Sequence, residues 1–194
     1  MVATNSTMLP LGTTASAFTL RDATTGTDVS LSDYDDKPVV LVMFISNHCP
    51  YVKHVASELG RLGSEYGPQG VGIVAIGSND IENYPDDAPV HMVEFAAANG
   101  FTFPCVQDET QSVAQAYRAA CTPDFYVFDT ERQLVYRGQL DGARPSNDVP
   151  VDGRDLRAAL DAALDGRPAP DPQVPSMGCN IKWKSGNAPE YFPA

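Results

Sequence analysis

The chain has little positive charge. Only 13 of its 194 residues are lysine or arginine, against 25 aspartates and glutamates, so the formal net charge is −12 at pH 7. Proteins that bind nucleic acid present a basic face to the phosphate backbone. The charge balance therefore argues against a nucleic-acid partner and indicates an acidic, well-solvated surface.

Long apolar runs are also missing. No stretch approaches the roughly 18–20 continuous apolar residues that a membrane helix needs, so we expect no membrane partner. Residues 1–18 lack the basic start and the apolar run of a secretory signal peptide. The four cysteines are too few for a disulfide scaffold in a chain of this size. These features together favour a cytoplasmic protein.

Motifs that bind cofactors are absent as well. The sequence has no Gly-rich phosphate loop, no dinucleotide fingerprint and no C-x-x-C zinc motif, so we expect neither a cofactor nor a resident metal. What remains is the composition of an ordinary globular protein, with 43% apolar and 20% charged residues. Its length suits one domain.

The order of the predicted elements is that of a mixed α/β domain. Apolar runs rich in β-branched residues predict strands that are buried on both faces. Strands joined through helices pair in parallel, and a late hairpin adds antiparallel strands. We predict hairpins over 19–34 and 124–140, strands over 37–46, 70–77 and 102–108, and helices over 49–66, 88–100, 110–120 (with Thr110 as N-cap) and 153–167.

Composition divides the chain into three parts. We expect a flexible N-terminus at 1–14, the main domain at 15–167 and a tail at 168–194. The tail carries six of the 16 prolines, so it should be extended and irregular. It also holds Trp183, the only tryptophan, and other large apolar residues that a disordered segment would usually lack. The tail should therefore pack on the domain.

The most informative stretch is FISNHCPYVKH, residues 44–54, in which Cys49 stands where an apolar strand passes into a helix. A cysteine reacts as its thiolate, so anything that lowers its pKa makes it a better nucleophile. The helix N-terminus supplies unpaired N–H groups and partial positive charge. Lys53 lies one turn on, and His48 and His54 add charge when they are protonated. Cys49 is therefore the candidate nucleophile.

The residues after Cys49 depart from a dithiol motif. Pro50 suits the first helical turn, where its missing N–H would lack a partner in any case. Val52, however, stands where a C-x-x-C protein has its second cysteine. Cys49 therefore cannot be resolved from within its own helical turn.

A second signal lies at CTPDFYVFD, residues 121–129. The Thr122–Pro123 pair directly precedes an apolar strand and is a candidate cis-proline, because X–Pro is the bond at which cis costs little. Cys121 lies two residues before this proline.

Taken together, NHCPYVKH, CTPDFYVFD, YRGQLDGARP and the tail segment PSMGCNIKWKSGNAPEYF resemble a bacterial group of thioredoxin-family proteins, the redoxin or AhpC/TSA-like group. The resemblance spans most of the chain. It implies an α/β thioredoxin-like fold, with a central mixed sheet flanked by helices, an N-terminal hairpin and an extended C-terminal tail. In that fold the reactive cysteine at the helix start faces the cis-proline loop. The resemblance implies thiol chemistry without naming a substrate.

We therefore expect a thiol–disulfide oxidoreductase with Cys49 as the attacking thiolate and Cys121 as the favoured resolving thiol. Pro123 would offer the backbone edge for a substrate strand, supported by Thr122, and Tyr51 would form the rim. The expected partners are a protein or small-molecule disulfide and a thiol electron donor. The sequence leaves the oligomeric state open.

Cys179 and Cys105 are the remaining thiols. Cys179 is a possible second redox thiol if the tail folds across the site. Cys105, within a predicted strand, is expected to be a buried structural residue.

Three alternatives stay open. The first is a peroxiredoxin-like thiol peroxidase with antioxidant activity. Ser46 matches the hydroxyl position of the peroxiredoxin motif, but Val42 replaces its proline, and Pro123 stands where an arginine would be expected.

The second alternative is a Cu- or Zn-binding protein that uses His48, Cys49, His54 and Cys121. The third is a thioredoxin-like interaction module without catalysis, which would leave the cationic surroundings of Cys49 unexplained.

Overall fold

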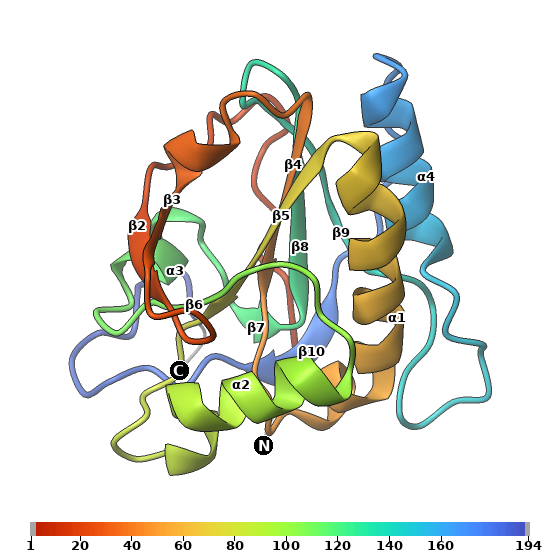
Figure 1. The fold of residues 1–194 in the computed structure, drawn as a ribbon. Helices are drawn as coiled ribbons and strands as arrows, with labels where there is room; N and C mark the ends of the chain where they lie inside the picture. Colours follow the sequence, from red (N-terminus) through yellow and green to blue (C-terminus); the bar gives the residue numbers. More distant parts are fainter. Residues whose placement is uncertain (1–2, 193–194) are drawn as a thin grey trace.

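The computed structural model describes residues 3–192 and has a seven-stranded mixed sheet at its centre, in the order β3–β2–β6–β5–β4–β8–β9 (Figure 1). The strands of this sheet are β2 (Thr19–Asp22), β3 (Asp28–Ser30), β4 (Val39–Phe44), β5 (Val71–Gly77), β6 (Cys105–Gln107), β8 (Asp124–Phe128) and β9 (Leu134–Gly138).

Strand β4 is the middle of the core because every one of its residues is apolar and buried. It pairs in parallel with β5 and antiparallel with β8. Successive side chains of a strand point to opposite faces, so β4 feeds two separate apolar clusters. Val39, Leu41 and Met43 belong to one cluster, and Val40, Val42 and Phe44 belong to the other.

Within residues 3–192, four α-helices cover these two faces: α1 (Pro50–Tyr66), α2 (Pro89–Ala98), α3 (Ser112–Ala116) and α4 (Arg154–Leu164). Helices α1, α2 and α4 pack on the first cluster through residues such as Leu59, Met92 and Leu160. Helix α3 lies on the opposite face with the β2–β3 hairpin (Figure 1). Short 3-10 helices occupy Leu31–Tyr34, Gly67–Gln69 and Pro85–Asp87. No helix of residues 3–192 is both long and apolar enough to cross a bilayer.

The expected α/β arrangement with a mixed sheet is confirmed. The parallel β4–β5–β6 pairing and the late β8–β9 hairpin agree with the sequence. The third helix is shorter than predicted, and its N-cap is Gln111 rather than Thr110. Gln111 is fully buried, and its side-chain amide donates to the Ser78 and Lys182 carbonyls at 2.8 Å each. Those tertiary contacts fix the start of α3 at a residue with no capping propensity.

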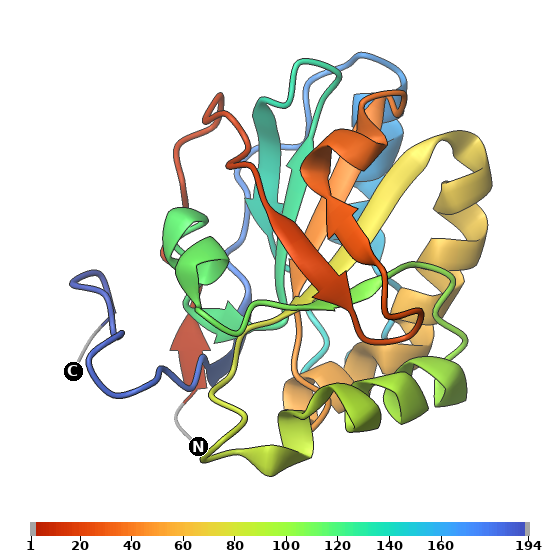
Figure 2. The same ribbon diagram turned by 60° about the vertical axis from the view of Figure 1, so that its left-hand side comes forward.

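A second, three-stranded sheet joins the two ends of the chain. Its order is β1–β10–β7, with β1 at Ala3–Asn5, β10 at Met177–Asn180 and β7 at Cys121–Thr122, all antiparallel (Figure 2). Residues 3–5, within the segment that the sequence suggests is flexible, thus pair with the tail. The tail continues inward, because Ile181 is buried in the second apolar cluster.

Candidate functional site

Cys49 is the N-cap of α1, directly after β4 and its short loop. The apolar run that forms β4 ends at Ile45, and Pro50 takes the first helical position, where no backbone donor is needed. Cys49 is fully buried. Its Sγ lies 3.2 Å from the carbonyl oxygen of Thr122, on the loop of the cis Thr122–Pro123 bond. The helix start and the cis-proline loop therefore face each other, as the resemblance implied.

The tail brings a second thiol to Cys49. In β10, Cys179 is the register partner of Thr122, whose carbonyl faces the Cys49 Sγ. A hydrogen bond joins the side chains of Cys49 and Cys179. Both residues are almost completely buried. No disulfide links any of the four cysteines, all of which lie within residues 3–192.

This hydrogen bond shifts the pKa values of the two cysteines in opposite directions. The hydrogen bond from Cys179 lowers the pKa of Cys49 to about 6, against burial, which raises it, and the Val52 amide adds a further hydrogen bond. The hydrogen bond to Cys49 and burial raise the pKa of Cys179 above the usual cysteine range. The Cys49 thiolate therefore accepts a hydrogen bond from the Cys179 thiol, a contact that depends on the tail folding across the site.

Cys121 and Cys105 have different surroundings. The Cys121 Sγ lies 3.7 Å from the Pro123 carbonyl oxygen and 3.9 Å from that of Ser176. Burial, followed by the nearby Asp124 carboxylate, raises the pKa of Cys121 well above its usual value. Burial likewise raises the pKa of Cys105 to about 12. Both environments favour the neutral thiol.

A buried carboxylate organises the loop before Cys49. Asp87 is 5% exposed and accepts hydrogen bonds from Ser46 Oγ at 2.9 Å and from Asn79 Nδ2 at 2.6 Å. His48 Nδ1 lies 2.6 Å from Asp87 Oδ2, the same oxygen that accepts from Asn79. Asp87 folds inward because its three partners lie just after the ends of β4 and β5.

This network perturbs both of its charged members. The hydrogen bond to Asp87 raises the pKa of His48. Burial alone would raise the pKa of Asp87, but the hydrogen bonds from His48 and Asn79 hold it below its usual value. The Ser46 hydroxyl is thus bound to Asp87, and the imidazole of His48 is held beside the start of α1.

The other predicted site residues lie around the thiols and differ in how far they are buried. Tyr51 and Pro123 line a narrow groove that also includes Met177. Lys53 is exposed and lines, with His48, a polar cavity of about 290 Å³ toward α2. His54 is partly buried. The site therefore unites Cys49, His48, Thr122, Pro123 and Tyr51, whereas Lys53 is exposed at its margin.

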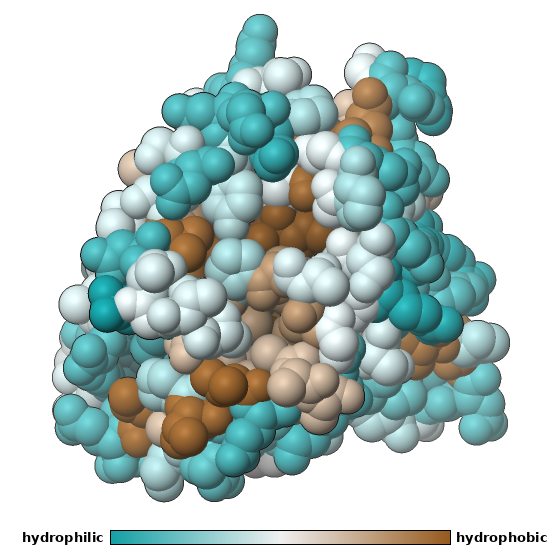
Figure 3. Space-filling model, in the orientation of Figure 1, coloured by the Kyte–Doolittle hydropathy of each residue, from teal (hydrophilic) through white to brown (hydrophobic). Residues whose placement is uncertain are grey.

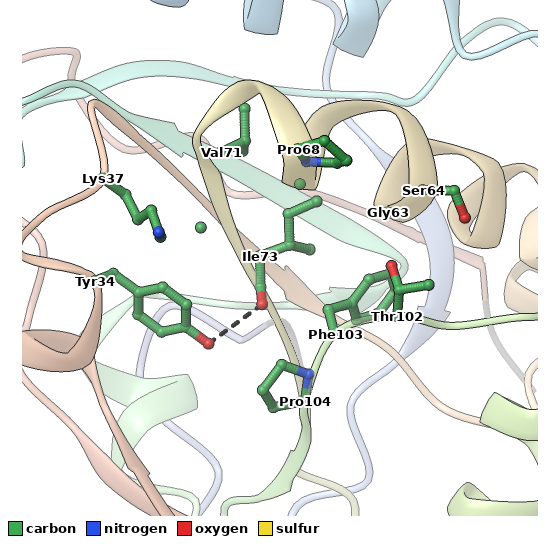
Figure 4. A pocket seen from close by; sticks show the side chains of 12 residues that line it. Tyr34, Lys37, Gly63, Ser64, Pro68, Val71, Ile73, Thr102, Phe103 and Pro104 are labelled. Atoms are coloured by element: carbon green, nitrogen blue, oxygen red, sulfur yellow. Dashed lines mark hydrogen bonds between the residues drawn. The ribbon is translucent and has the colours of Figure 1, made fainter.

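Other features of the surface lie away from the thiols. A cavity of about 510 Å³ opens beside Tyr34, Ile73 and Phe103, at the C-terminal end of α1, whereas Cys49 is at the N-terminal end (Figure 4). Figure 3 shows apolar surface in the hollow between the β2–β3 hairpin and α1. Among residues 3–192, no group of three or more His, Cys, Asp or Glu side chains is arranged to hold a metal ion.

A mixed sheet with a cysteine at the start of α1, opposite a cis-proline loop, defines the thioredoxin-like class. Within that class the chain belongs to the AhpC/TSA family, whose model matches residues 11–137. It is 30% identical over 131 residues to thiol-disulfide oxidoreductase ResA of Geobacillus kaustophilus (strain HTA426), covering 68% of this chain and 70% of ResA.

Two solved structures resemble nearly the whole chain. An uncharacterized conserved protein from Geobacillus kaustophilus is 54% identical, with a TM-score of 0.92, over 95% of this chain and 97% of that one. A hypothetical protein from Sinorhizobium meliloti 1021 is 48% identical, also with a TM-score of 0.92, over 94% of this chain and 100% of that one. The family model ends at residue 137, whereas these two likenesses extend over most of the chain.

Proposed function

We propose that this protein is a thiol–disulfide oxidoreductase in which Cys49 attacks and Cys179 resolves. The observation that carries the proposal is the hydrogen bond between the two thiols at the N-terminus of α1, opposite the Thr122 carbonyl. The family membership and the likeness to ResA, a thiol-disulfide oxidoreductase by name, support the same reaction class.

In the first step the Cys49 thiolate attacks one sulfur of a substrate disulfide. A Cys49–substrate disulfide forms, the substrate S–S bond breaks, and the second substrate sulfur leaves as a thiolate that takes a proton from solvent. With a pKa of about 6, Cys49 is mainly thiolate at neutral pH.

In the second step Cys179 attacks the sulfur of Cys49. A Cys49–Cys179 disulfide forms, and the first substrate sulfur leaves as a thiolate. The pKa of Cys179 is raised by its hydrogen bond to Cys49 and by burial. Once Cys49 is in a mixed disulfide it no longer carries a charge, so the Cys179 thiol loses its proton more readily. An external dithiol then reduces the Cys49–Cys179 bond.

This assignment reverses the order in which the sequence ranks the two candidate resolving thiols. Cys121 lies on the cis-proline loop as expected, but its sulfur faces backbone carbonyls and its thiol is kept protonated by burial and by Asp124. Cys179 contacts Cys49 directly. This contact favours Cys179 as the resolving thiol, because in thiol–disulfide exchange the attacking sulfur must come into contact with a sulfur of the disulfide.

The test is turnover of a disulfide substrate with a dithiol reductant. Cys49→Ser should abolish turnover. Cys179→Ser should lower it at least tenfold and accumulate a Cys49 mixed disulfide that mass spectrometry detects. Cys121→Ser is the matched control and should keep most of the activity. Full turnover in Cys49→Ser would refute the proposed nucleophile, and loss with Cys121→Ser alone would restore Cys121 as the resolving thiol.

The cellular location and the antioxidant activity expected from the sequence are also proposals. We propose a cytoplasmic location, in which a reducing environment would keep both thiols reduced between turnovers. Fractionation with thiol trapping tests this, and recovery of the protein outside the cytoplasm would contradict it. Antioxidant activity would use the same thiolate on a peroxide. A peroxide-reduction assay with Cys49→Ser as control tests that activity.

A further inference from the structure

Strand β10 occupies the edge of β7 at the redox site. Cys179 pairs with Thr122 and Asn180 pairs with Cys121, both antiparallel. On its other side β10 pairs with β1, where Gly178 is the partner of Thr4. The tail thus lays an extended strand beside β7 (Figure 1), and Cys179 of that strand is hydrogen-bonded to Cys49.

Gly178 makes an unusually close approach to this loop. A Cβ at this position would lie 1.9 Å from the Thr122 carbonyl oxygen and 2.5 Å from its carbonyl carbon. These are backbone atoms, so they cannot move aside as a flexible side chain would. Thr122 is also the residue whose carbonyl faces the Cys49 Sγ. Only glycine can therefore precede a cysteine that is seated here.

Strand β10 must leave the edge of β7 before Cys49 can react with a polypeptide. Cys49 has no exposed surface, and Cys179 is only 3% exposed. Of the segments around the thiols, β4 and α1 each contribute several side chains to the first apolar cluster, whereas β10 contributes only Cys179 and lies in the small second sheet. Exchange of β10 is therefore the opening that disrupts the core least.

We propose that the β7 edge is a strand-docking site selective for an extended peptide that carries a Gly-Cys pair, and that residues 177–180 occupy it as a built-in copy of that substrate. The proposal rests on the proposed function and names its substrate class. The incoming peptide takes the place of Met177–Asn180, with its glycine against Thr122 and its cysteine sulfur against Cys49. The tethered strand competes at high effective concentration, and it returns to the β7 edge while the peptide is still bonded to Cys49, so that Cys179 can attack the mixed disulfide.

The chemistry at this site is the exchange already described. The Cys49 thiolate attacks the peptide's cysteine sulfur in its disulfide. The Cys49–peptide bond forms, the peptide's original S–S bond breaks, and the former partner sulfur leaves as a thiolate.

The first experiment tests the built-in strand. Gly178→Ala in the full chain should unseat β10 and raise the rate of Cys49 alkylation by iodoacetamide at least tenfold. Gly67→Ala is the matched control, because a Cβ there meets nothing within 4 Å, and it should leave the rate unchanged. An unchanged rate in Gly178→Ala, with its folding confirmed by circular dichroism, would overturn the proposal.

The second experiment tests selectivity. Two peptides are compared. One has the sequence of residues 175–181, and the other has alanine in place of its glycine. In both, the cysteine is joined to a 2-thiopyridyl group through a disulfide. Release of pyridinethione by the Gly178→Ala/Cys179→Ser protein should be at least tenfold faster with the glycine peptide. The single variant Cys179→Ser should show the same preference, which keeps the test valid if the double variant does not fold. Equal rates for the two peptides would overturn the proposal.

A small activated disulfide separates this inference from the proposed function. The 2-thiopyridyl disulfide of cysteamine has no peptide backbone, so it tests only whether Cys49 attacks disulfides. If Cys49 fails to react with it in Gly178→Ala/Cys179→Ser, the proposed function fails. If Cys49 reacts with it but does not distinguish the two peptides, the docking site alone fails.

Discussion

At the scale of single residues, the reactivity of Cys49 depends on a neutral donor. The sequence suggested that cationic neighbours activate this thiol, but Lys53 is exposed, and the largest influence on the pKa of Cys49 is the hydrogen bond from Cys179. A thiol donor can both stabilise the thiolate and later attack the mixed disulfide. In the proposed mechanism, activation and resolution therefore belong to the same residue.

Removing that donor should raise the pKa of Cys49. In Cys179→Ala the thiolate keeps its burial penalty and loses its strongest hydrogen bond, so the pKa should rise from about 6 toward the ordinary cysteine value of 9.0. The thiolate absorbance followed against pH measures this, and the expected upward shift is one unit or more. Cys105→Ala is the control, because Cys105 lies in β6. An unchanged midpoint in Cys179→Ala would contradict the account.

Asp87 gives a second prediction at this scale. Asp87→Asn removes a buried acceptor with three partners and should lower the free energy of unfolding by about 1–3 kcal/mol. The lowered pKa of Asp87 gives stability that is lost as pH falls below its ordinary 3.8, and the raised pKa of His48 gives stability that is lost as pH rises above 6.5.

The difference in unfolding free energy between the protein and Asp87→Asn should therefore be largest between about pH 4 and 6.5. Urea unfolding across pH measures it. A difference that is constant from pH 4 to 9 would show that the His48–Asp87 pair does not titrate as described.

At the scale of elements, α1 is positioned by a close contact with the end of α2. A Cβ at Gly60 would lie 2.0 Å from the Asn99 carbonyl oxygen. Gly60→Ala should therefore force the two helices apart and destabilise the protein by about 1–3 kcal/mol. Thermal or urea unfolding provides the measurement.

Gly67→Ala is the paired comparison on the same helix. Gly67 is the C-cap, with an ordinary φ of −53° and open space around a Cβ. The substitution should be neutral or stabilise by about 0.4–1 kcal/mol, because it restricts the unfolded chain. Equal destabilisation by both substitutions would contradict the role of the Gly60 contact.

Elements with strong local patterns were predictable from the sequence. The apolar runs of β4 and β5 predict their central place, and the Pro50 helix start predicts the position of Cys49. The pairing of β10 with β7 was not predictable, because its paired residues are 57 and 59 positions apart and β10 follows a proline-rich segment without periodicity. Sequence spacing therefore favoured Cys121, the thiol nearest the cis-proline, over Cys179.

At the scale of the whole molecule, the second sheet ties both ends of the chain to the redox site. Strand β1 pairs with β10, and the carbonyl of Lys182 accepts hydrogen bonds from Gln111 and from the Asp80 amide. Oxidation state should therefore affect the stability of the entire fold, because a Cys49–Cys179 bond would close a loop of about 130 residues.

The oxidised protein should be more stable than the reduced one. Chain entropy sets an upper limit of about 5 kcal/mol for a loop of this length. The gain should be smaller, because the Cys179 hydrogen bond already stabilises the reduced form through the Cys49 thiolate. Urea unfolding of both forms measures it, with Cys179→Ser as control. A less stable oxidised form would contradict the pairing.

The most direct test of the account is a disulfide map. The full-length protein is oxidised mildly, remaining thiols are alkylated, and peptides are identified by mass spectrometry, with a sample alkylated before oxidation as control. We predict a Cys49–Cys179 disulfide, with Cys105 and Cys121 recovered as alkylated thiols. A Cys49–Cys121 disulfide, or a Cys49 that stays unmodified by both oxidant and alkylating reagent, would contradict it.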